Sequence, residues 1–322
     1  MPLFDRYIAV DWSAANTPRQ GRDSIWIGDS MADSINPPTR HDAMAILTDR
    51  LLAARAANQR VMLGFDFVFG YPEGAAHAIV GAFPDLATTT TPIAPLAGEV
   101  AQLVARRPSE ARRGGWSDLW STLNHLVTDN PDNSSNRFHV ASAINARLAV
   151  PHYWGHPHQH RYDNLNPRRP AAYATVPERR RAEILARTAQ PVWKLTGAGA
   201  VGSQSMLGIA RLEALRHHPS LGPDIAIWPF ETAFADALNK LITVVEIYPS
   251  LFPLDDPSIT PKDRAQVETC IRRFAALDAA DELRSFLGAP ANLSPAERDI
   301  LVREEGWIAG IGHASLAARQ AA

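Results

Sequence analysis

Three short apolar runs in this sequence each carry a carboxylate at or near their end, and this recurrence constrains the fold more than any other feature. The runs are YIAVD, ending at Asp11, VMLGFD, ending at Asp66, and ITVVEIY, which contains Glu246. Continuous apolar runs of this length are typical of strands covered by helices on both faces. An ionised carboxylate in such a strand is costly unless it is paired or binds a cation. We therefore expect one common explanation for the carboxylates in all three runs.

The segments around these runs alternate between strand and helix patterns, which is typical of an α/β fold with a sheet flanked by helices. Open sheets of this kind bind ligands at the carboxyl ends of their strands, so the three acids are expected to converge there. The patterns predict strands at 7–10, 24–28, 31–35, 61–65, 225–230 and 242–248, and helices at 41–57, 206–216 and 262–277.

Between residues 77 and 189 the pattern changes, and we predict a mostly helical insertion there, with helical patches at 119–127 and 140–148. The segments 1–76 and 190–322 are predicted to form the core. From Glu99 to Arg187 the chain has thirteen arginines, no lysine and eight acidic residues, so this region is mildly basic. Such an asymmetry suits an anionic substrate.

Composition excludes several classes of protein. The net charge of −2 gives no overall attraction to nucleic acid or to a membrane, so a site for a polyanion has to be local. Cys270 is the only cysteine, which removes disulfide frameworks and cysteine-based zinc sites and is typical of a reducing compartment. No apolar stretch reaches the roughly 18 to 20 residues of a membrane span. We expect a cytoplasmic protein without a membrane partner, and nothing predicts a protein partner.

Four short motifs in a fixed order resemble the predicted ribonuclease-H-like nucleases classed as domain of unknown function 429. The resemblance covers both flanks of the chain and leaves out the insertion. It implies a ribonuclease-H-like fold, with a metal-binding acid at Asp11, Asp66 and Glu246. The motifs are VDWS at 10–13, GFDFVFGYP at 64–72, VEIYPS at 245–250 and EEGWI at 304–308.

The resemblance also implies a fourth acid at the start of a late helix. In the family this helix opens with two aspartates three residues apart, whereas here KDRAQVE offers Asp263 with Gln266 at the second place. Asp278 and Asp281 have the same spacing and remain an alternative. Asp263 is preferred, because it opens a helix soon after the strand that carries Glu246.

Oxygen ligands without cysteine favour Mg²⁺ or Mn²⁺. With Asp11, Asp66, Glu246 and Asp263 as ligands, two such ions about 3.5–4 Å apart would activate a water for attack on a phosphodiester. The predicted function is metal-dependent hydrolysis of a nucleic acid. Two alternatives stay open: an ATP-binding phosphoryl-transfer protein of the sugar-kinase or actin type, and a non-catalytic binding module, which Gln266 in place of an acid suggests.

The segment LTGAGAVGSQS is the candidate for binding a substrate phosphate. Its glycines precede a predicted helix, and backbone N–H groups at a helix start bind anions. Ser203, Gln204 and the upstream Lys194 are possible further donors. The alternative is a structural turn with a solvated lysine, because the spacing matches neither known phosphate-binding fingerprint.

Two arginine pairs, Arg106 with Arg107 and Arg112 with Arg113, lie near two tryptophans, Trp116 and Trp120. Arg112 and Arg113 are predicted to contact substrate phosphates, with the tryptophans stacking on bases. The alternative is a pair of solvated helix ends above core tryptophans.

Four histidines crowd one loop of the insertion and raise the question of zinc. A polar, aromatic surface is preferred over a metal site, because no known cluster of carboxylates accompanies them. The histidines are His152, His156, His158 and His160.

Overall fold

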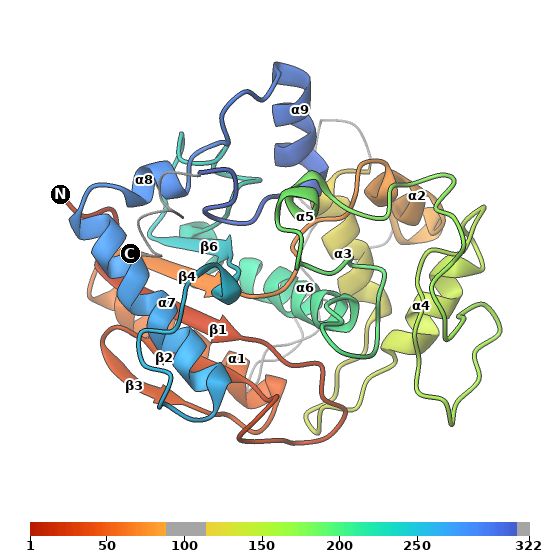
Figure 1. Cartoon of the computed structure of the whole chain (residues 1–322), viewed down its shortest axis with the longest axis horizontal. Helices are drawn as coiled ribbons and strands as arrows, with labels where there is room; N and C mark the ends of the chain where they lie inside the picture. Colours follow the sequence, from red (N-terminus) through yellow and green to blue (C-terminus); the bar gives the residue numbers. More distant parts are fainter. Residues whose placement is uncertain (88–113, 314–322) are drawn as a thin grey trace.

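A six-stranded mixed sheet forms the centre of the chain in a computed structural model, which describes residues 1–87 and 114–313 (Figure 1). The strand order is β3-β2-β1-β4-β6-β5; β1, β4, β6 and β5 run parallel to one another, and β2 is antiparallel to both of its neighbours, β1 and β3. The predicted α/β fold with a mixed sheet flanked by helices is confirmed. The strands are β1 (Arg6–Asp11), β2 (Trp26–Asp29), β3 (Ala32–Ile35), β4 (Val61–Phe65), β5 (Ile225–Ile227) and β6 (Ile242–Glu246).

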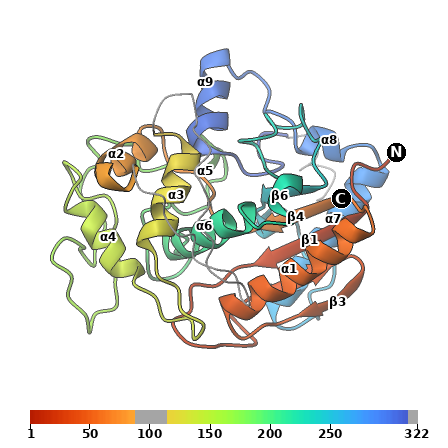
Figure 2. The same ribbon diagram turned by 180° about the vertical axis from the view of Figure 1, so that it is seen from behind.

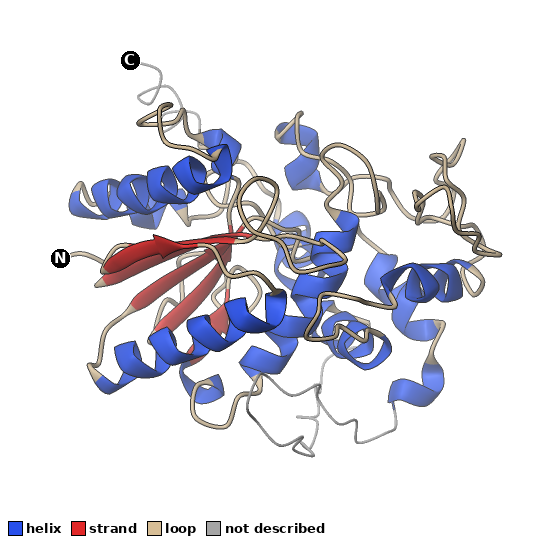
Figure 3. Cartoon of the chain, turned by 90° about the horizontal axis from the view of Figure 1, so that it is seen from below, coloured by secondary structure: helices blue, strands red, loops and turns tan. Residues whose placement is uncertain are grey.

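Helices α1 (Arg40–Ala56) and α7 (Lys262–Ala279) cover opposite faces of the sheet. Helix α7 crosses in front of the strands in Figure 1, and α1 does so in the view from behind in Figure 2. Figure 3 shows the strands between these two helical layers, with most of the remaining helices gathered beyond one end of the sheet. These are α2 (Ala75–Gly81), α3 (Trp116–Leu126), α4 (Arg137–Asn145), α5 (Arg181–Leu185), α6 (Gly202–Arg216) and α9 (Pro295–Ile300). The short helix α8 (Leu283–Phe286) instead packs beside α7 (Figure 1).

Alternate strand residues belong to two different hydrophobic clusters, because successive side chains of a strand point to opposite faces. Ile8 and Val10 lie in the cluster that also contains the buried side chains of α1 and α6. Tyr7 and Ala9 lie in the cluster that contains the buried side chains of α7. These apolar runs therefore stabilise the sheet by burial on both faces.

Within the described residues of the insertion, helices α3 and α4 are followed by a long irregular segment. Helices α3 and α4 each begin three residues before the predicted helical patches, and residues 146–180 contain no helix or strand. Trp120, Phe138 and Tyr153 pack in the same cluster as Ile8. The described part of the insertion thus shares a core with the sheet, and the division into two domains stays a prediction.

In residues 1–87 and 114–313, no helix has both the length and the apolarity that a membrane crossing needs.

Gly70 allows two of the sequence motifs to meet backbone against backbone. A Cβ atom at this position would lie 2.1 Å from the carbonyl oxygen of Glu305. The Glu305 side chain accepts the backbone N–H of Glu73 at 3.1 Å, so Glu305 contacts the turn after β4 through both its backbone and its side chain. Gly70, the second glycine of GFDFVFGYP, is therefore needed for the EEGWI segment to lie close to the backbone of this turn.

We predict that Gly70→Ala lowers the free energy of unfolding by about 3 kcal/mol, because backbone atoms have to move to admit the methyl group. Urea denaturation measures the change. Gly81→Ala, in α2 where nothing lies within 4 Å of the added Cβ, is the control. It should be neutral or stabilising by up to about 1 kcal/mol. Equal losses in the two variants would contradict the close packing.

Candidate active site at the carboxyl ends of β1 and β4

Two of the predicted acids lie side by side at the end of the sheet. Val10 of β1 pairs with Phe65 of β4, so Asp11 and Asp66, one residue further along, stand level with each other. Their side chains share a hydrogen bond. One oxygen of Asp66 also accepts the backbone N–H of Trp12 at 2.7 Å. Parallel pairing of β1 and β4 thus brings the two carboxyl groups into contact.

The acidic pair holds a proton to an unusually high pH. Burial raises the pKa of Asp11 well above its ordinary value, and the charges of Asp66 and Asp263 raise it further. Burial also raises the pKa of Asp66, to about 7. Neither carboxyl forms an ion pair with any part of the chain that the structure describes. The pair is therefore an acidic site without a counter-charge, which is a common property of functional sites.

Glu246 does not join this pair, because it is one residue out of phase. It pairs with Phe65, not with Asp66, so strand alternation points its side chain to the opposite face of the sheet. There Arg180 donates to both of its carboxylate oxygens, at 2.5 and 2.9 Å. The structure thus assembles two of the three strand acids, and its described residues hold no group of three or more His, Cys, Asp or Glu side chains suited to a metal ion.

Arg180 is the residue that the sequence analysis missed. It is completely buried and comes from the end of the insertion. Besides Glu246, it donates to the Glu183 side chain and to the Glu305 carbonyl, both at 2.9 Å. It therefore joins the insertion, the end of β6 and the EEGWI motif. The arginine run at 179–181 gave no sign of which carboxylate it would meet.

Asp263 is the acid that the structure places near the pair, as the sequence analysis preferred. It lies in the first turn of α7, accepts the backbone N–H of Asp23 at 2.6 Å, and its charge contributes to the raised pKa of Asp11. Asp278 instead accepts two backbone N–H groups near the amino terminus and the hydroxyl of Tyr7. Asp281 follows α7 in a left-handed conformation with φ of 60°. Asp278 and Asp281 therefore lie at the carboxyl end of α7, whereas Asp263 lies at its amino end.

A cavity of about 380 Å³ opens beside the acidic pair, at the carboxyl ends of β4 and β6. The start of α6 and the glycine-rich loop before it form one wall of this cavity. Gln266, where the sequence resemblance implied a second acid, lines it from α7. The polar residues of its lining include Asp66, Glu246, Arg180, Gln204, Gln266 and Tyr248.

The three side chains predicted to donate hydrogen bonds to a substrate phosphate lie in different surroundings. Gln204 lines the cavity and donates its side-chain amide to the carbonyl of Trp12. Ser203 is buried and donates to the Leu195 carbonyl at 2.7 Å. Lys194 donates to the Ala198 carbonyl at 2.6 Å and does not line the cavity, so it stabilises the loop. Of the three, Gln204 alone is placed to meet a molecule in the cavity.

The predicted arginine contacts, Arg112 and Arg113, lie outside the described residues, as do Arg106 and Arg107. The neighbouring tryptophans of α3 are core residues. Trp120 is completely buried and donates its indole N–H to the Phe69 carbonyl, and Trp116 stacks on Phe230.

The histidine loop shows no zinc site within the described residues. His152 is buried, lies 2.6 Å from the Val150 carbonyl through its Nδ1 atom, and packs against Trp193. His156 lies 2.9 Å from the Pro157 carbonyl. These imidazoles contact backbone and aromatic rings.

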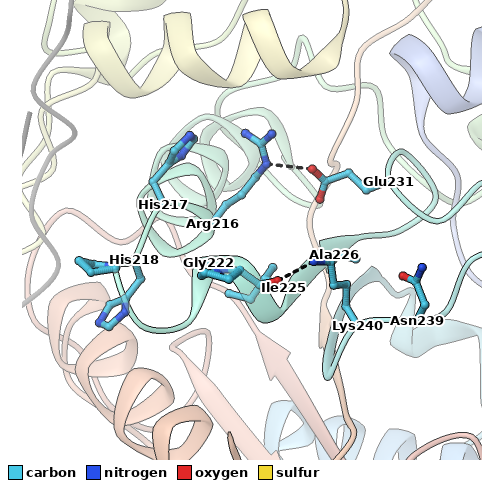
Figure 4. A pocket seen from close by; sticks show the side chains of 11 residues that line it. Arg216, His217, His218, Gly222, Ile225, Ala226, Glu231, Asn239 and Lys240 are labelled. Carbon is cyan, nitrogen blue, oxygen red and sulfur yellow. Dashed lines mark hydrogen bonds and ion pairs between the residues drawn. The ribbon is translucent and has the colours of Figure 1, made fainter. Parts of the chain in front are cut away.

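A second cavity, of about 340 Å³, lies at the other end of the sheet, where β5 begins (Figure 4). Arg216, His217 and Lys240 line it, and Arg216 pairs with Glu231 at 3.2 Å. The Asp11–Asp66 pair is not part of it. The cavity at the carboxyl ends of the strands is therefore the candidate site.

Comparisons of this chain with models of protein families, with curated proteins and with solved structures found no match.

We predict that the metal-free protein becomes less stable as the pH rises from about 4 to 7. An unfolded aspartate has a pKa near 3.8, whereas the pKa of folded Asp66 is about 7, so over this window the folded state holds a proton that the unfolded state has lost. This contribution to the free energy of unfolding is fully lost above pH 7. Asp66→Asn should reduce the pH-dependent decrease in the free energy of unfolding by about 2 kcal/mol, a value that allows for the partial exposure of the Asp66 side chain. Chemical denaturation in a chelating buffer at several pH values measures it.

The control for this prediction is Asp299→Asn, which changes an exposed carboxylate of a surface pair. Its stability should follow the wild-type pH profile. A wild-type profile that rises between pH 4 and 7, or one that Asp66→Asn leaves unchanged, would contradict the assignment.

We also predict that Arg180→Met lowers the free energy of unfolding by about 3–5 kcal/mol, because Glu246 and Glu183 are left buried without their cation. Adding Glu246→Gln should restore part of the loss. Arg169→Met, which breaks an exposed pair with Glu178, is the control and should cost about 1 kcal/mol or less. Similar losses from Arg180→Met and Arg169→Met in urea denaturation would contradict the role of the buried network.

Proposed function

We propose that this chain binds one divalent cation, Mg²⁺ or Mn²⁺, between Asp11 and Asp66, and hydrolyses a phosphodiester of a nucleic acid on a ribonuclease-H-like fold. The observation that carries the proposal is the half-buried carboxyl pair without a counter-charge among the described residues, beside a polar cavity. Two acids forced together at a covered strand end are unfavourable for folding. A bound cation would remove that penalty.

The donor set suits Mg²⁺ in particular. This ion keeps several waters and usually binds one or two protein carboxylates together with substrate phosphates. Asp11 and Asp66 supply the two carboxylates, and Asp263 adds negative charge nearby. Because Arg180 pairs with Glu246, we propose one cation and not the two expected from the sequence.

When bound, the cation would polarise a phosphoryl oxygen and lower the pKa of a coordinated water. The side chains of this protein perform the positioning. The Trp12 N–H and the amide of Gln204 hold the segment that follows Asp11 against Asp66 and α6. Gln266 and Tyr248, which line the cavity, would donate hydrogen bonds to the substrate phosphate.

The sheet supports the fold part of the proposal. Antiparallel β2 and β3 follow β1 directly, and the acids stand at the ends of β1 and β4, in the order that the resemblance implies. The motifs VDWS and GFDFVFGYP supply the acidic pair itself.

We predict that Mn²⁺ binds the wild-type protein and that Asp11→Asn and Asp66→Asn each weaken this binding at least tenfold. Binding displaces the shared proton, so the affinity should increase between pH 6 and 8. Isothermal titration calorimetry in two buffers of different ionisation enthalpy measures both the affinity and the proton release. Asp299→Asn is the matched control and should bind as the wild type does. Equal affinities in the wild type and Asp11→Asn would contradict the site.

Cleavage is tested by incubating the wild type and Asp66→Asn with single- and double-stranded DNA and RNA in Mg²⁺ and in Mn²⁺. We expect cleavage of at least one substrate by the wild type and none by the variant. Tight ATP binding without cleavage would favour phosphoryl transfer instead. Absence of Mn²⁺ binding would favour a non-catalytic module.

A further inference from the structure

Arg137 is a buried cation without a carboxylate partner. It lies in the first turn of α4 and is 4% exposed. Its guanidinium donates to three neutral side chains: the Ser203 hydroxyl at 3.0 Å, the Ser135 hydroxyl at 2.7 Å and the amide oxygen of Asn16. Its Nη2 atom has no partner in residues 1–87 and 114–313. Burial lowers the pKa of this guanidinium to about 10, and the positive charge of Arg40 lowers it further, against the opposing effect of Asp129.

Each of the other buried arginines of the described chain is paired with a carboxylate. Arg6, Arg40, Arg180 and Arg211 each lie within 2.9 Å of a carboxylate oxygen. An unpaired buried charge is costly, so an exception to this pattern needs a reason of its own.

The surroundings of Arg137 add further positive charge. Arg40 and Arg211 share a single carboxylate, Asp129. Three guanidinium groups therefore stand against one buried carboxylate, which leaves a local charge of about +2 from these four groups. Asp132 also lies in this region, but it is at the surface and accepts hydrogen bonds from Ser134.

Arg137 meets the start of α6, which is a second source of positive potential. Its contact, Ser203, is the second residue of this fifteen-residue helix. The backbone N–H groups of Ser203 and Gln204 have no acceptor in the described chain, and no side chain caps the helix. Helix starts of this kind bind phosphate oxygens.

We propose that Arg137 and the start of α6 form an anion site for a phosphate of the substrate other than the one that is cleaved. Ser203 and Arg137 do not line the cavity beside Asp66, whereas Gln204 does, so the two sites are adjacent and meet at the start of α6. The segment that follows Asp11 connects them, because Gln204 binds the carbonyl of Trp12 and Arg137 binds Asn16. A nucleic-acid backbone, with its repeated phosphates, is the ligand class that fills both sites. That the bound anion is a phosphate of the substrate rests on the proposed function, whereas the anion site itself does not depend on that function.

The test uses inorganic phosphate and a short single-stranded oligonucleotide without terminal phosphates as probes, both without added metal. Arg137→Met should raise the dissociation constant for each at least tenfold in calorimetric titration, whereas Arg137→Lys should keep part of the affinity. Arg147→Met, which changes an exposed arginine just beyond α4, is the matched control and should bind as the wild type does. If the methionine variant does not fold, Arg137→Gln replaces it, because its amide retains hydrogen-bond donors.

The outcomes separate this site from the acidic pair. Mn²⁺ affinity should be unchanged in Arg137→Met, and phosphate affinity should be unchanged or increased in Asp66→Asn. Loss of phosphate binding in Arg137→Met supports the anion site even if the wild type does not bind Mn²⁺, a result that would overturn the proposed function alone. Equal phosphate affinity in the wild type, Arg137→Met and Arg137→Gln, or no phosphate binding by the wild type, would overturn the anion site.

Discussion

The pairing register of β1, β4 and β6 is the constraint on which the candidate site depends. Asp11 and Asp66 stand level and face the α7 side, whereas Glu246 stands level with Phe65 and faces the other side. Side chains alternate along a strand, so a shift of one residue moves a carboxylate to the opposite face. The register therefore creates two acidic environments at one end of the sheet, where the motifs alone suggested a single cluster.

The carboxylates of these two environments differ in how their negative charge is compensated. On one face, Arg180 neutralises Glu246 and also binds Glu183 and the Glu305 carbonyl, so the insertion and the EEGWI motif are tied to the end of β6. On the other face, Asp11 and Asp66 interact with each other and form no ion pair with the described residues, so the pKa of Asp11 is raised. A buried network that is fully paired serves structure, whereas an unpaired one is a candidate for binding. The same reasoning distinguishes Arg137 from the other buried arginines.

Sequence patterns located most elements of the fold. The carboxylates marked the ends of β1, β4 and β6, and the α7 helix begins at Lys262, as predicted. Long-range partners were not predictable in the same way. Arg180 lies 66 residues before Glu246, and Ser203 lies 66 residues after Arg137. Nothing in the local pattern around these residues distinguishes a solvated arginine from a buried one, because local periodicity reports burial of apolar side chains only.

The sequence by itself determined the α/β alternation, the three acidic strand ends and the start of a helix at Lys262, because hydrophobic periodicity and helix-start signals are local. Only the tertiary structure decided that Asp11 and Asp66 meet while Glu246 turns to Arg180. That outcome depends on which residues of neighbouring parallel strands pair, and on where the insertion returns to the sheet. Both are set by packing between segments far apart in the chain, which no local pattern encodes.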